Sequence, residues 1–263
     1  MVDIRKAEGV VIRRRLFSDT SLIATFFTDR FGKVRVIAKG ALRRGSPLRG
    51  KLDLFMRNSI LFYHGRGDLH IVKECDTIGS YGGIRDDLDR IVAASYIAEI
   101  VDGLTLPEAP DGSLYALLVQ SLAALNASDR PVQVAACFAP RLLSVLGIFP
   151  RYSSCAECGE RLEGERFYDG ASFRCKGCLS RPAAAVSGGT AALIDRILSP
   201  GGPGPDALSP PAEQLSELVA LSSAIFEAES GRRMKTRLMA WCPAAGRAVD
   251  EGRNPVQNAC KPG

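Results

Sequence analysis

Residues 21–51 read SLIATFFTDRFGKVRVIAKGALRRGSPLRGK, and this stretch decides how the N-terminal third folds. Residues 21–28 are rich in Ile, Phe and Thr, and residues 32–38 alternate, with Val34 and Val36 on one face. The intervening Asp-Arg-Phe-Gly is typical of a turn. The stretch therefore predicts two antiparallel strands followed by a long basic loop over residues 39–51.

Three neighbouring segments extend this strand pair. Residues 7–15, 52–63 and 69–78 have strand character, and Gly-Arg-Gly-Asp at 65–68 separates the last two. Five short strands in about 80 residues suit a small closed barrel, because closure removes exposed edges. We expect an oligonucleotide-binding (OB) type barrel, although an SH3-like barrel also has five strands.

Positive charge is concentrated in the same third of the chain. Residues 1–80 contain 16 Lys and Arg against 8 Asp and Glu, whereas residues 81–263 contain 18 against 21. Residues 30–57 alone hold nine cations and one carboxylate. Such a field attracts polyanions and accelerates their association. The alternative is a solvated basic face without a partner.

The loop at 39–51 mixes three glycines with five cations, Lys39, Arg43, Arg44, Arg49 and Lys51. Arginine forks match phosphate oxygens, and glycines let them follow a backbone of variable shape. The loop is not a nucleotide-triphosphate loop, because Ser46 stands where the phosphate-binding lysine is needed. Most of the nearby aromatic residues are expected in the core, with one or two free to stack on bases: Phe17, Phe26, Phe31, Phe55, Phe62 and Tyr63.

The remaining chain predicts helices around a four-cysteine insert. Apolar stripes indicate helices at 86–101, 114–125, 131–146, 187–198 and 215–226, with Asp111 or Ser113 and Ser187 as caps. Pro140 is expected to kink the third helix and Gly147 to end it. Residues 199–211 form a loop. The expected domains are an OB domain at 1–80, helical parts at 81–150 and 183–242, a zinc module at 151–182 and a disordered tail at 243–263.

Four of the eight cysteines form the sharpest local motif. Cys155-Ala-Glu-Cys158 and Cys175-Lys-Gly-Cys178 are sixteen residues apart, a spacing that places four thiolates around one structural Zn²⁺. A redox pair or a metal-free remnant is the alternative, and an intracellular disulfide is disfavoured. Cys75 and Cys137 are expected to be small core residues.

Composition and motifs exclude several classes. The chain is 46% hydrophobic and 24% charged, as in an ordinary globular protein. Its longest uncharged run, residues 112–128, is too short and too polar for a membrane span. The N-terminus does not read as a signal peptide, so we expect an intracellular protein. No common catalytic motif appears, so we expect no enzyme, and the two histidines, His64 and His70, are expected to be structural.

The order of these parts resembles the bacterial RecO family of DNA-repair recombination mediators. Residues 27–33 followed by 36–44 resemble the family's strand–turn–strand and basic loop, and residues 141–158 resemble its helix-to-zinc junction. Phe167, Gly170 and residues 235–237 continue the likeness, which spans about residues 1–240. Pro140 and Ala171 depart from the family pattern, where an uninterrupted helix and a second glycine are usual.

The resemblance implies a fold and a function. The fold is α+β and multidomain, with an OB-type barrel and a helical domain carrying the zinc module. Such proteins bind single- and double-stranded DNA, anneal complementary strands, bind RecR and the acidic tail of single-stranded-DNA-binding protein, and help load a RecA-type recombinase. They are cytoplasmic and nucleoid-associated. Ten cations are expected on DNA: Arg13, Arg14, Arg15, Lys33, Arg35, Lys39, Arg43, Arg44, Arg49 and Lys51. Three are expected on the acidic tail: Arg141, Lys235 and Arg237.

Two other functions remain open. Zinc modules and small barrels also serve RNA, so an RNA-binding or ribosome-associated factor is the main alternative. It predicts a preference for structured RNA over single-stranded DNA. An adaptor that binds only acidic proteins is the other, and it predicts no DNA affinity even at low salt.

Overall fold

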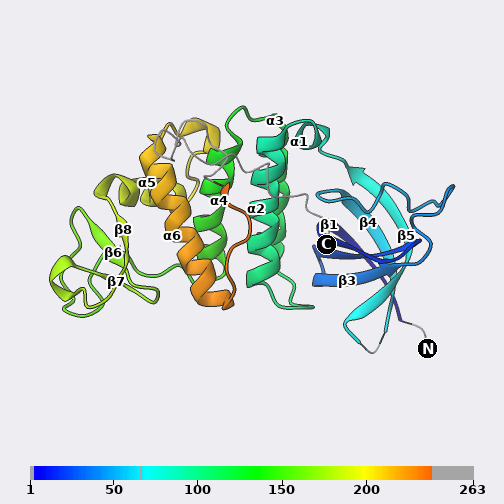
Figure 1. The fold of residues 1–263 in the computed structure, drawn as a ribbon, viewed down its shortest axis with the longest axis horizontal. Helices are drawn as coiled ribbons and strands as arrows, with labels where there is room; N and C mark the ends of the chain where they lie inside the picture. Colours follow the sequence, from blue (N-terminus) through cyan, green and yellow to red (C-terminus); the bar gives the residue numbers. More distant parts are fainter. Residues whose placement is uncertain (1–2, 66, 239–263) are drawn as a thin grey trace, which may run out of the picture.

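The computed structural model describes residues 3–65 and 67–238, and these residues form three parts in a row (Figure 1). The barrel lies at one end, a helical body occupies the middle, and a small sheet with the cysteine motif lies at the other end. The predicted tail at 243–263 lies outside the described residues, as do Cys242 and Cys260. None of the described helices is long and apolar enough to cross a bilayer.

The N-terminal part is a closed barrel with strand order β1-β2-β3-β5-β4. Its strands are β1 (Asp3–Ser18), β2 (Ser21–Thr28), β3 (Gly32–Ala38), β4 (Arg57–His64) and β5 (Leu69–Gly79). Most neighbours are antiparallel, but β3 and β5 are parallel, and β1 pairs with β4 to close the barrel. The interior holds small and branched side chains such as Ala24, Val36 and Ile60, all fully buried. The expectation of five strands in a closed barrel is confirmed.

The fourth strand is shorter than expected. It begins at Arg57 rather than at Leu52, because residues 52–55 form turns. Leu52 and Phe55 are nevertheless buried, and Phe55 adopts a φ of 66° that ends any extended run there. Its N–H donates to the Val11 carbonyl at 2.9 Å. These apolar residues pack against the core although they lie in turns. Their apolar character therefore led to the wrong prediction of a strand over these positions.

In the described part of the chain, the helical body comprises six α-helices. They are α1 (Gly82–Arg85), α2 (Leu88–Leu104), α3 (Gly112–Ala127), α4 (Pro131–Val145), α5 (Gly188–Leu198) and α6 (Ala212–Ser230). Asp111 and Ser187 cap α3 and α5 as expected, accepting from Leu114 N–H and Thr190 N–H. The helix α4 continues through Pro140, and Gly147 follows its end with a φ of 70°.

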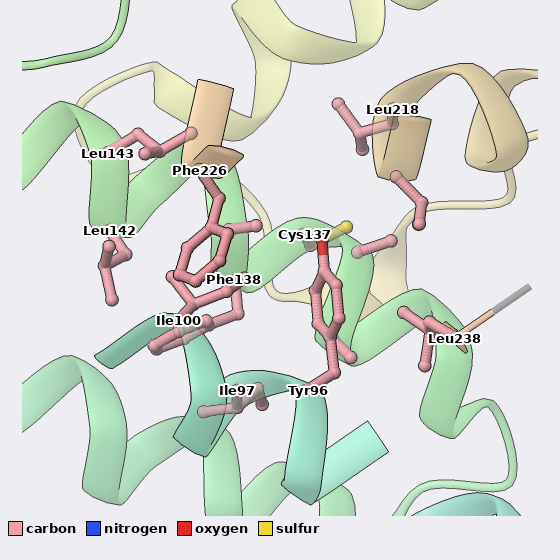
Figure 2. Packing of buried hydrophobic residues seen from close by; sticks show 14 of the residues in the cluster. Tyr96, Ile97, Ile100, Cys137, Phe138, Leu142, Leu143, Leu218, Phe226 and Leu238 are labelled. Atoms are coloured by element: carbon pink, nitrogen blue, oxygen red, sulfur yellow. The ribbon is translucent and has the colours of Figure 1, made fainter. Parts of the chain in front are cut away.

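An apolar stripe through Leu88, Ile91, Val92 and Ser95 is the face that the sequence predicts to be buried on α2, and this prediction is wrong. Leu88 is 56% exposed, whereas Ala94, Ile97 and Val101 are fully buried. The helix α2 packs against β1, α3, α4 and α6 together, so it is buried on several sides and has no single apolar stripe. Figure 2 shows Ile97 and Ile100 of α2 beside Phe138 and Leu142 of α4 and Phe226 of α6. Val10, Ile12, Phe27 and Phe55 of the barrel join the same apolar cluster, which fastens the barrel to the helices.

The third part is a three-stranded sheet, β7-β6-β8. Its strands are β6 (Arg166–Tyr168), β7 (Phe173–Arg174) and β8 (Ala184–Val186). Two 3₁₀ turns, Lys176–Cys178 and Pro205–Ala207, complete the described elements. The strand β8 leads directly into α5, so the sheet and the cysteine motif are anchored to the helical body.

Candidate nucleic-acid interface and metal centre

A row of cations crosses the outer face of three barrel strands. Arg13 of β1 pairs with Thr25 of β2, which in turn pairs with Arg35 of β3, so the three side chains share one face. Arg15 lies two residues along β1 on the same face. Arg13, Arg15 and Arg35 line a hollow of about 270 Å³. Lys33 lines it as well, so the structure brings together four of the cations predicted from sequence.

Lys33 differs from the other three cations of this hollow because it already has partners within the chain. Its side chain is only 12% exposed, and its Nζ donates to the Asp102 carbonyl at 2.6 Å, 3.5 Å from the Asp102 carboxylate. Burial lowers the pKa of Lys33, and the interaction with Asp102 partly opposes this. Lys33 therefore joins the barrel to α2 rather than presenting a free charge.

Arg14 and Lys51 are also engaged within the chain. Arg14 Nη1 lies 2.7 Å from Asp53 Oδ1. Lys51 Nζ donates to the Cys75 carbonyl at 2.8 Å and lies 3.2 Å from Asp76. Both contacts fix the far end of the basic loop against the barrel.

The basic loop presents its remaining cations to solvent. Lys39, Arg43, Arg44 and Arg49 are all exposed. The beginning of the loop is tied to the β1–β2 hairpin, because Leu42 N–H donates to the Thr20 carbonyl at 3.0 Å and Gly40 N–H to Ser21 Oγ. The beginning of the loop is therefore held beside the hairpin tip, with its cations exposed.

One exposed aromatic side chain, which could stack on a base, lies near the hairpin tip. Phe26 and Phe62 are fully buried and Phe55 is 6% exposed, whereas Phe17 is 59% exposed. Phe31 and Tyr63 are half-buried. Phe17 is therefore the most accessible of the six aromatic residues considered from sequence, and Leu16 beside it is 71% exposed.

A second hollow, of about 290 Å³, lies where the barrel meets α2 and the end of α6. Its apolar lining includes Leu54, Phe55 and Phe226. Two acidic residues, Glu99 and Asp102, also line it. Its five cations are Arg13, Arg14, Arg232, Arg233 and Lys235. The sequence analysis missed Arg232 and Arg233, although their adjacency just before Lys235 was a usable signal.

The three cations predicted to bind an acidic partner do not share one surface. Lys235 lines the second hollow. Arg141 lines a different hollow beside α4, and its guanidinium donates to the Ile197 and Pro203 carbonyls. Arg237 is exposed near the end of the described residues. Arg141 thus holds the start of the 199–211 loop on α4.

The four cysteines meet at one point, as the motif predicts. Their sulfur atoms lie within 4.8 Å of one another, and Cys158 Sγ is 3.9 Å from Cys175 Sγ. All four are free thiols. Tetrahedral Zn²⁺ with bonds of about 2.3 Å separates its sulfur ligands by about 3.8 Å. The donor set and the spacing therefore fit a closed tetrathiolate site.

Backbone geometry supports the same arrangement. Gly159 adopts a φ of 74° and donates its N–H to the Cys155 carbonyl at 3.0 Å, closing the first knuckle. The N–H groups of Cys158 and Cys175 lower the pKa of Cys155 to about 6, because they stabilise its thiolate. The neighbouring Cys175 and Cys158 thiols raise the pKa of Cys178 to about 12. A cation among the four sulfur atoms would favour the ionised form of all four.

A buried carboxylate supports the second knuckle. Asp169 Oδ2 lies 2.6 Å from Arg174 Nε and 3.1 Å from Arg181 Nη2, and Asp169 Oδ1 accepts from the Ser172 N–H. Burial opposes ionisation, but the Ser172 N–H and the Arg174 guanidinium lower the pKa of Asp169 overall. Asp169 and Arg174 therefore fix the β6–β7 hairpin that leads into Cys175.

The fold and these sites define a class: a basic five-stranded barrel joined to a helical body that carries a four-cysteine module. Sequence comparison agrees. Residues 1–81 match the family described as "Recombination protein O N terminal", and residues 85–238 match "Recombination protein O C terminal". The chain belongs to the RecO family of DNA repair proteins.

Three relatives named "DNA repair protein RecO" illustrate the similarity. The chain is 37% identical to that of Moorella thermoacetica over 62% of its own length and 61% of the relative. It is 32% identical to that of Acetivibrio thermocellus, over 73% and 78% of the two chains. It is 34% identical to that of Desulfitobacterium hafniense, over 73% and 72%.

Proposed function

We propose that this chain is a non-enzymatic recombination mediator. It binds single- and double-stranded DNA, anneals complementary strands, and helps load a RecA-type recombinase onto strands coated with single-stranded-DNA-binding protein, together with RecR. The observation that carries the proposal is the row of Arg13, Arg15 and Arg35 on a RecO-family barrel, together with the exposed cations of the basic loop.

We infer that the barrel is of the OB type. The order β1-β2-β3-β5-β4 with a parallel β3–β5 pair supports this inference. OB barrels bind nucleic acid across strands 2 and 3 and through the loops between strands 1 and 2 and strands 4 and 5. Arg13, Arg15 and Arg35 lie on that face, and Phe17 lies beside the first of those loops.

The proposed DNA contacts divide by what each side chain already binds. Lys39, Arg43, Arg44 and Arg49 are exposed on the loop and would neutralise phosphates, as would Arg13, Arg15 and Arg35 on the barrel strands. Arg14, Lys33 and Lys51 would add to the positive electrostatic potential, while their ion pairs with carboxylates of the chain stabilise the surface. Annealing requires no bond chemistry, because screening the repulsion between two polyanions is sufficient to bring them together.

The acidic tail of single-stranded-DNA-binding protein is proposed to dock in the second hollow. An apolar floor at Leu54, Phe55 and Phe226 suits apolar terminal residues, and the Arg232, Arg233 and Lys235 rim suits acidic ones. This position adjoins the DNA face, because Arg13 borders both hollows. A coated strand could thus be held by its protein and its phosphates together.

The four cysteines are proposed to hold one structural Zn²⁺ per chain. Cys155, Cys158, Cys175 and Cys178 would supply all four ligands, which leaves no position for a reactive water. The metal would supply folding free energy to the module. We further propose the division into an OB domain at 1–80, a helical domain at 81–150 and 183–242, and a zinc module at 151–182.

The test is annealing of two labelled complementary strands, each coated with single-stranded-DNA-binding protein, without nucleotide and at two salt concentrations. We expect annealing well above the uncatalysed rate. Arg43→Glu with Arg44→Glu should slow it at least tenfold, whereas Arg151→Glu with Arg161→Glu, an equal charge change on exposed residues of the cysteine module, should not. Failure to anneal, with a preference for structured RNA, would favour the RNA-binding function instead.

A further inference from the structure

The two histidines of the chain meet one glutamate where the helical body crosses the barrel. His64 ends β4, His70 is the second residue of β5, and Glu108 lies in the segment between α2 and α3. Glu108 N–H donates to the Lys33 carbonyl at 3.0 Å, and Pro107 pairs with Lys33 as an isolated bridge. Glu108 has a φ of 54°, a costly conformation that these contacts maintain. The carboxylate is thereby held over the β4–β5 hairpin.

The donor atoms have the spacing of a metal site. His64 Nε2 lies 3.3 Å from each Glu108 oxygen, and His70 Nε2 lies 3.1 Å from Glu108 Oε1. One donor atom of each residue lies within 4.8 Å of the others. Tetrahedral Zn²⁺ with nitrogen and oxygen bonds of about 2.0–2.1 Å separates its ligands by about 3.3 Å. The distances from each Nε2 to the Glu108 carboxylate therefore match the edges of a coordination tetrahedron.

Both imidazoles are already oriented. His64 Nδ1 lies 3.4 Å from Asp3 Oδ2, so this carboxylate can accept the Nδ1 proton when an ion occupies Nε2. His70 is 1% exposed and stacks on Phe62 with ring centroids 5.5 Å apart. Glu108 remains 41% exposed and His64 23%, so water has access to a fourth position.

We propose that His64, His70 and Glu108 form a second metal site, which binds Zn²⁺ through the two Nε2 atoms, a carboxylate oxygen and one water. The site is separate from the cysteine cluster in the third part of the molecule. Because its ligands come from the barrel and from the α2–α3 segment, the bound ion clamps the helical body onto the β4–β5 hairpin.

Metal binding requires a change at His70. Without metal, His70 Nδ1 accepts the Gly65 N–H at 3.3 Å, so its proton lies on Nε2 and is donated to Glu108. On binding, the proton leaves Nε2 and another is taken up at Nδ1, so the ring releases no net proton. The Gly65 N–H loses its acceptor and turns to water. Arg5 Nη1, 3.9 Å from Glu108 Oε2, also competes with the ion. The site should therefore fill after the cysteine cluster.

The test titrates the purified full chain with Zn²⁺ and, separately, with Co²⁺ under reducing conditions. We expect two metal ions per chain. The first Co²⁺ should give intense thiolate charge-transfer absorption, and the second only weak d–d bands. Glu108→Gln and His64→Gln should each weaken the second event at least tenfold and leave the first intact. Glu74→Gln, a matched change on an exposed residue of β5, should retain both events.

The far-ultraviolet circular dichroism of each variant reports that it is folded, and its thiolate absorption reports that the cysteine module is intact. Cys158→Ser, conversely, should disrupt the intense absorption and retain the weak one. A wild-type chain that binds one equivalent, or Glu108→Gln and His64→Gln variants that bind two as the wild type does, would overturn the proposal. The three side chains would then act only as a hydrogen-bonded contact.

Hydrogen exchange tests the clamp itself. The second equivalent of Zn²⁺ should slow exchange at the Glu108 N–H, which bonds to the Lys33 carbonyl, and should speed it at the Gly65 N–H. Unchanged exchange at Glu108 despite two bound ions would reject the clamping role.

Discussion

At the scale of single residues, one glycine allows the barrel to contact the α2–α3 segment closely. Gly32, at the start of β3, has a φ of 59°, and a Cβ there would lie 2.1 Å from the Ala109 carbonyl oxygen. The same carbonyl region leads into Asp111, the cap of α3. A glycine that reads as an ordinary turn residue in the sequence is thus the point where the α2–α3 segment touches the barrel.

We expect Gly32→Ala to lower the free energy of unfolding by about 2–5 kcal/mol, combining left-handed strain with overpacking. Gly45→Ala is the matched control, because Gly45 also has a positive φ of 81° but has no atom within 4 Å of the new Cβ. Gly45→Ala should lower the free energy of unfolding only by the cost of the left-handed backbone conformation. Urea unfolding of both variants measures the difference, and equal losses would show that the close approach carries no energy.

At the scale of elements, one carboxylate joins α5 to α6. Glu217 Oε2 accepts from the Ser187 N–H at 2.9 Å, the Ser187 hydroxyl at 2.8 Å and the Thr190 hydroxyl at 2.6 Å. Burial alone raises its pKa, but the bonds from Thr190 and Ser187 lower the pKa of Glu217 overall. The carboxylate of α6 therefore completes the N-terminal cap of α5.

Glu217→Gln should lower the free energy of unfolding by about 1–3 kcal/mol at pH 7, because charged hydrogen bonds are lost. Because the folded pKa lies below the unfolded value, this stabilisation is complete above about pH 4.3 and disappears as pH falls through the folded pKa. The difference between variant and wild type should shrink in that acid range. Glu213→Gln, exposed on the first turn of α6, should change stability by only a few tenths of a kcal/mol.

The cysteine module is the other element with its own source of stability. Cys155→Ser should reduce zinc by one ion per chain and unfold the segment around β6 and β7, since a structural site contributes folding free energy. DNA binding by the barrel should persist. Elemental analysis with limited proteolysis measures both effects. Cys75→Ala, at a buried thiol of the barrel, should retain the zinc, and loss of zinc there would contradict this assignment.

At the scale of the whole molecule, two cationic surfaces meet at Arg13 but differ in most of their residues. The proposed DNA surface comes from the barrel strands and the basic loop, whereas the proposed acidic-tail dock combines Leu54 and Phe55 of the barrel with α2, α6 and the residues after α6. Substitutions far from Arg13 should therefore separate the two activities.

Arg232→Glu with Arg233→Glu should weaken binding of an acidic-tail peptide at least tenfold while leaving binding of naked DNA within about twofold. Arg43→Glu with Arg44→Glu should do the reverse and should reduce the salt slope of DNA binding by roughly two units, about one per lost phosphate contact. Fluorescence anisotropy with labelled peptide and labelled strand measures both. If either pair weakened both ligands equally, a single shared surface would be indicated.

Local pattern was sufficient for much of this molecule. Strand alternation at 32–38, the caps at Asp111 and Ser187, the basic loop and the paired cysteine motif depend on near neighbours in the chain, so the sequence alone predicted them. Cys75 and Cys137 were likewise predicted as buried.

Only the tertiary structure decided what each polar side chain binds. Lys33 and Arg14 read as free cations, yet they pair with Asp102 and Asp53, 69 and 39 residues away. Arg232 and Arg233 line a hollow together with Leu54 and Phe55 of the barrel. His64 and His70 form a cluster with Glu108 of the α2–α3 segment. Charge and hydrogen bonding act over a few ångströms in space, whatever the separation along the chain. The sequence therefore determined the elements, and the packing of α2 between barrel and helices determined which residues meet.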